Sequence, residues 1–195
     1  LADITKDKKA LKAGDKVYSV CMDKTVALFQ IGKKKLEKGM NILGAHIDSP
    51  RMDVKQNPLY ESEEFAYLDT HYYGGIKKYQ WVTLPLALHG VVVKKDGTVI
   101  TVNVGEDKND PVFCVTDLLI HLAGEQMEKK ANKVIEGENL DVLVGSKPLE
   151  GKEKDAVKEG ILEILKEKYD MTEEDFMSAE IEVVPAGHAR EAGLD

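Results

Sequence analysis

The feature that most strongly constrains the fold of this chain is a pair of β-rich runs joined by a short polar turn. Trp81 to Val93, WVTLPLALHGVVV, is almost wholly apolar, and Thr98 to Val104, TVITVNV, alternates apolar and polar residues. Lys95-Asp96-Gly97 lies between them as a turn signal, so the pattern predicts a β-hairpin. Pro85 cannot donate to a sheet ladder and therefore predicts an edge or a bulge. We expect a small antiparallel β module in the middle of the chain.

Other segments extend this β pattern on both sides. Lys16 to Gly32 predicts a hairpin that turns at Met22-Asp23-Lys24. Asn41 to Ala45 is short and almost wholly apolar, which suits a strand buried on both faces. Asn57-Pro58 is a turn signal. Three more strands are expected, at 65–71, 140–144 and 179–184.

Two helices are expected in the second half of the chain. Thr116 to Lys130 begins with a candidate N-cap residue, although Gly124 weakens the centre of this helix. Asp155 to Tyr169 is the clearer helix, because its apolar residues form one stripe at helical spacing. These residues are Val157, Ile161, Ile164 and Leu165. Thr172 to Asp175 resembles a capping arrangement in which Asp takes the place of the usual Glu or Gln.

Composition excludes several classes of protein. The 195 residues carry a formal net charge of −8, so no general basic surface is available for nucleic acid. No apolar run is long enough to span a membrane, and the charged N-terminal stretch does not resemble a signal peptide. Cys21 and Cys114 lie far apart and form no disulfide framework, which fits a reducing compartment. We therefore expect a cytoplasmic protein with neither a nucleic-acid nor a membrane partner.

His46 and Asp48 end the apolar run in the stretch NILGAHIDSPR. A neutral imidazole is a strong zinc ligand, and a nearby carboxylate can orient its ring. The motif is short and common, however, so from His-x-Asp alone a polar pair that closes a strand into a Ser-Pro turn is the better explanation. A catalytic zinc needs about three protein ligands, so this pair is only part of a site.

The remaining histidines do not complete that site. His71 is expected on a β surface, His89 in the core, His188 in an exposed loop, and His121 at the rim of a helix packed on a sheet. The sequence has no HExxH, no GxSxG and no phosphate-binding glycine loop. A metal-dependent hydrolase of another substrate class stays an alternative that rests on His-x-Asp alone.

Four longer motifs indicate the protein's family more specifically than His-x-Asp does. GAHIDSPR, NPLYE, THYYGGIKKYQWVTLPLALHGVVV and AEIEVVPAGHAREAGLD occur in this order over most of the chain. Together they resemble the aspartyl aminopeptidase and vacuolar aminopeptidase I family of zinc metallopeptidases, and its bacterial members in particular.

The resemblance implies an α/β fold with two domains. The chain would hold the start of a two-zinc aminopeptidase catalytic domain and an inserted β-rich dimerisation domain. On this template, residues 1–58 begin the catalytic domain, 59–184 form the inserted domain, and 185–195 return to the catalytic domain. A peptide substrate and a homodimer, or a larger homo-oligomer, are implied as partners.

The same resemblance assigns three residues. His46 matches the first zinc ligand, and Asp48 matches the carboxylate that supports this histidine. His121 resembles the histidine that the inserted domain extends into the active site of the partner subunit to bind substrate. Two zinc ions are implied for each complete site, and Co²⁺ or Mn²⁺ could replace them.

The family's other metal ligands and its general base lie downstream of the residues that match. We therefore expect a portion of a longer zinc aminopeptidase, an expectation to which Leu1 in place of Met contributes. Such a portion would be inactive by itself. The alternative is a non-catalytic dimerisation or assembly module that lacks a complete metal site. The preference for acidic or neutral N-terminal residues stays open.

Overall fold

The computed structural model describes residues 1–7 and 9–194, which form two compact units. The first unit is Leu1–Ile47, and the second begins at Asp48. Three strands form the sheet of the first unit, in the order β1-β2-β3. They are β1 (Ala2–Asp3), β2 (Lys16–Cys21) and β3 (Thr25–Gln30). β1 is parallel to β2, whereas β2 and β3 form the predicted antiparallel hairpin.

The hairpin turn uses left-handed backbone conformations at two residues. Met22 and Asp23 have φ values of 52° and 54°, respectively. Residues with side chains adopt this region only at some cost, which a tight hairpin turn offsets. The position of the turn confirms the prediction made from Met22-Asp23-Lys24. A short 3₁₀ turn, η1 (Leu36–Lys38), follows the hairpin.

The prediction of a strand at Asn41–Ala45 is wrong for this structure. These residues lie in no strand, and Ile42 and Leu43 are 82% and 99% exposed. A strand buried on both faces needs neighbouring strands for its backbone and cover for its side chains. Neither is supplied within residues 1–7 and 9–47 of the first unit, so the apolar pattern alone does not produce a strand.

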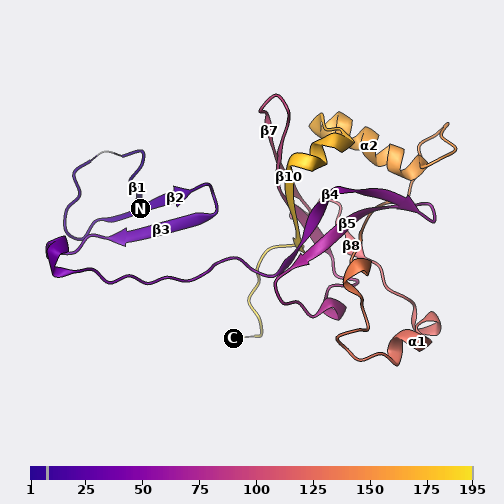
Figure 1. Ribbon diagram of the computed structural model, residues 1–195, viewed down its shortest axis with the longest axis horizontal. Helices are drawn as coiled ribbons and strands as arrows, with labels where there is room; N and C mark the ends of the chain where they lie inside the picture. Colours follow the sequence, from indigo (N-terminus) through magenta and orange to yellow (C-terminus); the bar gives the residue numbers. More distant parts are fainter. Residues whose placement is uncertain (8, 195) are drawn as a thin grey trace. The chain divides into compact units, whose positions relative to one another are not determined.

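A curled antiparallel sheet of seven strands organises the second unit (Figure 1). The strand order is β7-β6-β10-β4-β5-β9-β8, and each neighbouring pair is antiparallel. The strands are β4 (Arg51–Ser62), β5 (Phe65–Tyr73), β6 (Leu86–Val93), β7 (Val99–Val104), β8 (Cys114–Val115), β9 (Val142–Gly145) and β10 (Ala179–Pro185). The antiparallel module predicted from the sequence is confirmed, although the described chain is mostly β and not evenly α/β.

The β6–β7 hairpin forms where the sequence predicted it. The Lys94 N–H donates to the Thr98 carbonyl at 2.8 Å, and Gly97 occupies the turn with a φ of 86°. Pro85 immediately precedes β6, as its missing N–H requires. Gly90 lies in β6 where a Cβ would come within 2.0 Å of the Glu180 carbonyl oxygen of β10. This close approach explains a glycine in the middle of a buried strand.

Asn57-Pro58 does not form the predicted turn. β4 runs through both residues, and its pairing with β5 shifts register between Val54 and Leu59. A bulge of this kind accommodates a proline that cannot donate to the ladder. The two compact units meet at Ile47–Asp48, and the division of the chain at Pro58 that the family resemblance implies stays a prediction.

The helix α2 (Ala156–Tyr169) confirms the clearer helix prediction. Glu61 of β4 accepts hydrogen bonds from the Val157 and Lys158 N–H groups, each at 2.8 Å, and so caps the start of the helix. Val157, Ile161 and Leu165 pack on the core, whereas Ile164 is 46% exposed and does not belong to the buried stripe. Figure 1 shows α2 at one end of the curled sheet and α1 at the other.

The second capping prediction is also confirmed. The Thr172 N–H donates to Asp175 Oδ2 at 2.8 Å, and a reciprocal capping box begins the 3₁₀ helix η5 (Glu173–Ser178). β10 follows directly. Three further 3₁₀ turns lie in the second unit: η2 (Lys78–Gln80), η3 (Ile120–Leu122) and η4 (Gly137–Asn139).

The helix expected from Thr116 to Lys130 is wrong. Only η3 and the four-residue α1 (Gly124–Met127) form there, and Thr116 caps neither of them. Helices of this length depend on packing of an apolar face, and the large apolar residues of this segment are exposed. These residues are Leu118, Leu119, Ile120, Leu122 and Met127. Gly124 further lowers the helix propensity at its centre.

The core of the second unit lies on one face of the curled sheet. Its fully buried side chains include Met52 of β4, Leu86 of β6 and Leu140, which precedes β9. Alternate residues of β4 and β5 point to the opposite, polar face. In the described part of the chain, no helix has both the length and the apolar character to cross a membrane.

Candidate functional site

His46 lies in the extended segment that ends the first unit. It is exposed, and it follows the apolar residues of 41–45 without a strand to hold it. Regular backbone hydrogen bonds therefore do not position this imidazole. The prediction that His46 is a zinc ligand stays a prediction.

Asp48 begins the second unit and is held by the end of β5. The Tyr73 hydroxyl donates to Asp48 Oδ2 at 2.9 Å. This hydrogen bond and the negative charge of Asp48 raise the pKa of Tyr73. Asp48 is thus a carboxylate with a defined hydrogen-bond donor, which is a requirement for a residue that orients another group.

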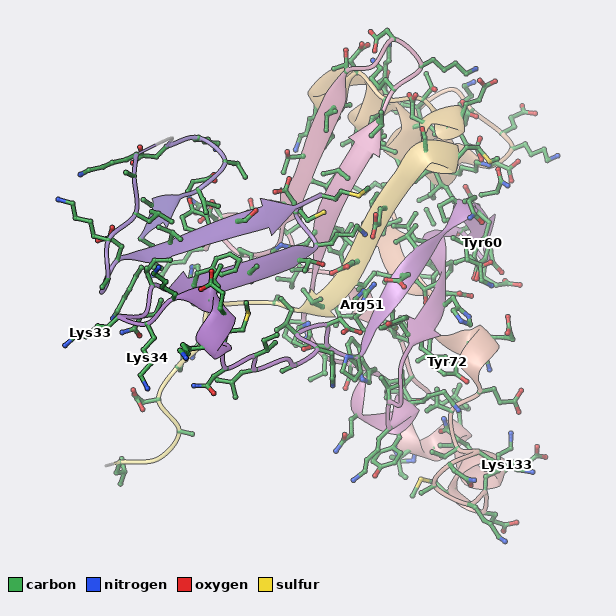
Figure 2. All side chains as sticks on the ribbon, turned by 60° about the vertical axis from the view of Figure 1, so that its left-hand side comes forward. Lys33, Lys34, Arg51, Tyr60, Tyr72 and Lys133 are labelled. Carbon is green, nitrogen blue, oxygen red and sulfur yellow. The ribbon has the colours of Figure 1, made fainter. Side chains whose placement is uncertain are left out.

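Arg51 lies beside the same tyrosine. Its guanidinium carbon is 4.3 Å from the centroid of the Tyr73 ring, within the range of a cation–π contact. Figure 2 shows Arg51 near one end of β4 and Tyr60 toward the other. The sequence analysis did not identify Tyr73 or Arg51 as site residues. Arg51 closes the motif GAHIDSPR, but only the strand register shows that it meets Tyr73.

Within residues 1–7 and 9–194, no group of three His, Cys, Asp or Glu side chains could hold a metal ion. His46 and Asp48 provide one nitrogen and one carboxylate, whereas a catalytic zinc needs about three protein ligands. The described residues therefore do not make a complete zinc site. Any zinc chemistry requires ligands beyond these two.

His121 lies in the 3₁₀ turn η3, on the exposed segment before α1. The expectation that this histidine sits at the rim of a helix packed on a sheet is wrong, because the helix does not form. His121 stands instead in an exposed apolar surface segment together with Leu119 and Leu122. The role in substrate binding that the family resemblance implies stays a prediction.

The other histidines divide between the sheet and the C-terminal stretch. His71 is exposed on β5, as expected, and its ring stacks on Tyr72 at a centroid distance of 5.5 Å. His89 is only half-buried and lies 2.8 Å from Glu106 Oε1, so the prediction of a core histidine is wrong. His188 is exposed after β10, as expected.

A second polar cluster joins β4 to the residue before β9. The Tyr60 hydroxyl donates to Asp141 Oδ2 at 2.5 Å, and Asp141 Oδ1 is buried without a hydrogen-bond partner in the described part of the chain. Burial raises the pKa of Asp141 and also that of Tyr60. Lys55 Nζ and Asp69 Oδ1 form an ion pair nearby, at 2.8 Å. The sequence analysis did not find this cluster, because its members are scattered along the chain.

Comparison of the sequence and of the fold with known proteins places this chain in a class of metallopeptidases. The chain belongs to the aminopeptidase I zinc metalloprotease family (M18), whose model matches residues 3–195. This confirms the resemblance drawn from the four motifs. The family is one of zinc enzymes, although the described residues alone do not complete a zinc site.

Individual relatives support the same assignment. A probable M18 family aminopeptidase 1 of Clostridium acetobutylicum is 64% identical over 196 residues, covering 100% of this chain and 42% of the relative. The crystal structure of aminopeptidase I from the same organism has a TM-score of 0.85 at 65% identity, covering 94% of this chain and 40% of that one. An M18 aminopeptidase structure from Thermotoga maritima has a TM-score of 0.83 at 50% identity, with coverages of 89% and 38%.

The chain thus spans about two fifths of the length of the curated relatives that it matches. A more distant structure, the dodecamer of S. cerevisiae mApe1, shares the fold at 18% identity with a TM-score of 0.55.

Proposed function

We propose that this chain forms part of a zinc-dependent aminopeptidase, which removes N-terminal residues from peptides. Membership of the M18 family over residues 3–195 is the observation that carries this proposal. The anchored carboxylate of Asp48, two residues after His46, supports it, because such a pair suits a metal-bound imidazole and its orienting group.

Each predicted site residue has a separate role in this proposal. His46 binds one of two zinc ions, and Asp48 orients its ring. The remaining ligands come from the part of the family fold that this chain does not span. His121 contacts substrate across a subunit boundary, for which its exposure leaves it available. Co²⁺ or Mn²⁺ can replace zinc at such a site.

The architecture follows the same template. The first unit would begin the catalytic domain, and most of the second unit, within 59–184, would be the inserted dimerisation domain. The residues after Pro185 would return to the catalytic domain. We propose a homodimer that builds a larger homo-oligomer, in keeping with the dodecamer of the distant S. cerevisiae relative.

A chimeric enzyme tests the proposal directly. Residues 1–195 replace the matching segment of the Clostridium acetobutylicum relative, which supplies the rest of the fold. The chimera should release amino acids from amino-acid anilides and bind zinc. His46→Ala should remove activity and bound zinc together, while His71→Ala, an exposed histidine on β5, should leave both unchanged. Full activity and normal zinc content in His46→Ala would refute the assigned role.

The exposed apolar segment Leu118–Leu122 favours a second candidate, a non-catalytic dimerisation module. Contiguous exposed apolar surface is typical of protein–protein contacts. Sedimentation of the chain at high micromolar concentration tests this candidate. A dimer that Leu119→Glu dissociates would support it, and a monomer would count against it.

A further inference from the structure

The hydroxyl that holds Asp48 belongs to a side chain that is itself restrained. Tyr73 is 44% exposed, and an exposed tyrosine is ordinarily free to change rotamer. Here Tyr73 lies directly opposite Arg51 in the β4–β5 pairing, so the two side chains project from the same face. The guanidinium lies over the ring at 4.3 Å, which fixes the plane of the phenol.

Arg51 is in turn fixed by two carboxylates from different strands. Its Nε lies 2.8 Å from Asp53 Oδ1 of β4 and 3.0 Å from Glu182 Oε1 of β10. The Arg51 side chain is only 17% exposed. A guanidinium that is hydrogen-bonded to Asp53, paired with Glu182 and largely buried loses much of its rotamer freedom, so it is a rigid support for the ring above it.

The backbone beside Asp48 lies against the same end of β5. Gly74 follows Tyr73 with a φ of 75°, and a Cβ there would be 3.5 Å from the Cβ and Cγ of Pro50. Pro50, two residues after Asp48, therefore lies next to the residue after Tyr73. The side chain and the backbone of the 48–50 segment are both held at one place on the sheet.

We infer that Tyr73 and Arg51 act as positioning residues, which together fix the carboxylate of Asp48 on the sheet. Asp53 and Glu182 hold Arg51, Arg51 holds the Tyr73 ring, and the Tyr73 hydroxyl holds Asp48. The inference rests on the proposed function, because that function is what gives the Asp48 carboxylate a role in the site. Neither positioning residue needs to touch the substrate.

The first test measures the Asp48 side chain in the isolated chain. In solution NMR, a fixed χ1 rotamer gives Hα–Hβ couplings that are each either large or small, whereas rotamer averaging brings both to intermediate values. Wild type should show the couplings of a single rotamer at Asp48. Tyr73→Phe keeps the ring and removes the hydroxyl, so it should average them. Tyr67→Phe is the matched control, because Tyr67 lies on the same face of β5, six residues away.

The second test uses the chimeric enzyme. Tyr73→Phe should lower kcat by about 10–100-fold, the usual cost of losing a group that supports a metal-site residue, with KM little changed. Arg51→Lys keeps the charge but loses the planar stack, so it should show a smaller loss of kcat in the same direction. Tyr67→Phe should match wild type in both constants.

The outcomes separate the inference from the proposed function. Single-rotamer Asp48 couplings in Tyr73→Phe, or a wild-type kcat in this variant, would overturn the inference while the proposed function stands. An inactive wild-type chimera would overturn the proposed function, and the NMR experiment would still decide whether Tyr73 fixes Asp48.

Discussion

Tyr60→Phe should destabilise the second unit more at neutral pH than in acid. The Tyr60 hydroxyl donates to Asp141 Oδ2 at 2.5 Å, while Asp141 Oδ1 is buried with no hydrogen-bond partner in residues 9–194. Burial raises the pKa of Asp141, whereas the bond from Tyr60 lowers it. The hydroxyl therefore stabilises the ionised carboxylate, which otherwise resists burial.

The expected magnitude follows from the chemistry of this bond. A hydrogen bond to a charged group contributes roughly 1.5–3 kcal/mol, and one between neutral groups about 1 kcal/mol. Phenylalanine keeps the ring, so no cavity is formed. Because both residues are only half-buried, solvent screening favours the lower values. We expect a loss of about 1.5 kcal/mol in the free energy of unfolding at pH 7, and of about 0.5 kcal/mol in acid.

The sign of the pH dependence follows from the raised pKa of Asp141. Because the pKa of Asp141 is higher in the folded protein than in the unfolded chain, the folded state holds the proton more tightly. The resulting contribution to stability is fully present below pH 3.8, the unfolded pKa, and is lost as the pH rises through the folded pKa. Removal of the hydroxyl raises the folded pKa further. The difference in stability between wild type and Tyr60→Phe should therefore grow as the pH rises from 3.8 toward neutrality.

Urea denaturation at two pH values measures this difference. Trp81 is the single tryptophan and lies in the second unit, so its fluorescence reports the unfolding of that unit. Tyr67→Phe is the control, because its ring stacks on Tyr60 at 5.5 Å but its hydroxyl is not the Asp141 donor. An equal loss at both pH values, or a larger loss in acid, would refute this account of the Tyr60–Asp141 pair.

Two further predictions concern the stability of the second unit. Gly90→Ala should cost at least about 3 kcal/mol, because its Cβ would come within 2.0 Å of a carbonyl oxygen of β10. At Gly124 an added Cβ would meet nothing within 4 Å, so Gly124→Ala should leave the free energy of unfolding unchanged or raise it when measured by urea denaturation. Equal losses of stability in Gly90→Ala and Gly124→Ala would contradict this prediction. Lys166 and Lys94 lower the pKa of Asp170 to about 2. The ionised Asp170 therefore stabilises the fold fully at pH values above 3.8, its pKa in the unfolded chain, and this stabilisation is lost as the pH falls to about 2. Asp170→Asn should thus be less stable than wild type at neutral pH but not below about pH 2, and a difference that persists in strong acid would refute this prediction.

The elements that the sequence predicted correctly have their determinants close together in the chain. The β6–β7 hairpin needs an alternating strand and a Lys-Asp-Gly turn, and α2 needs a helical apolar stripe. Even there, Ile164 was placed in the buried stripe, because spacing alone does not show how much of the helix surface the sheet covers. Glu61, which caps α2 from β4, was missed because it is 96 residues from Val157 in the chain.

In the candidate site, too, the residues that are close in sequence were predicted and those brought together by the fold were missed. His46 and Asp48 were found because they stand two residues apart in a recognisable motif. Tyr73 is 25 residues from Asp48, and only the register of β4 and β5 brings it opposite Arg51. The bulge at Asn57-Pro58 lies within that pairing, and the sequence indicated a turn there. A prediction that ended β4 at Pro58 would not have paired its full length with β5.

The two failed predictions of regular structure share one physical cause. Residues 41–45 and 116–130 both have the apolar pattern of buried elements, and in both the large apolar side chains are exposed. β9 and α2 have comparable local patterns, but they pack against β5 and its neighbours. A helix or a strand of ordinary length gains most of its stability from such packing and little from propensity. What distinguishes the failed segments is therefore the cover that the rest of the described chain provides, and not the local signal.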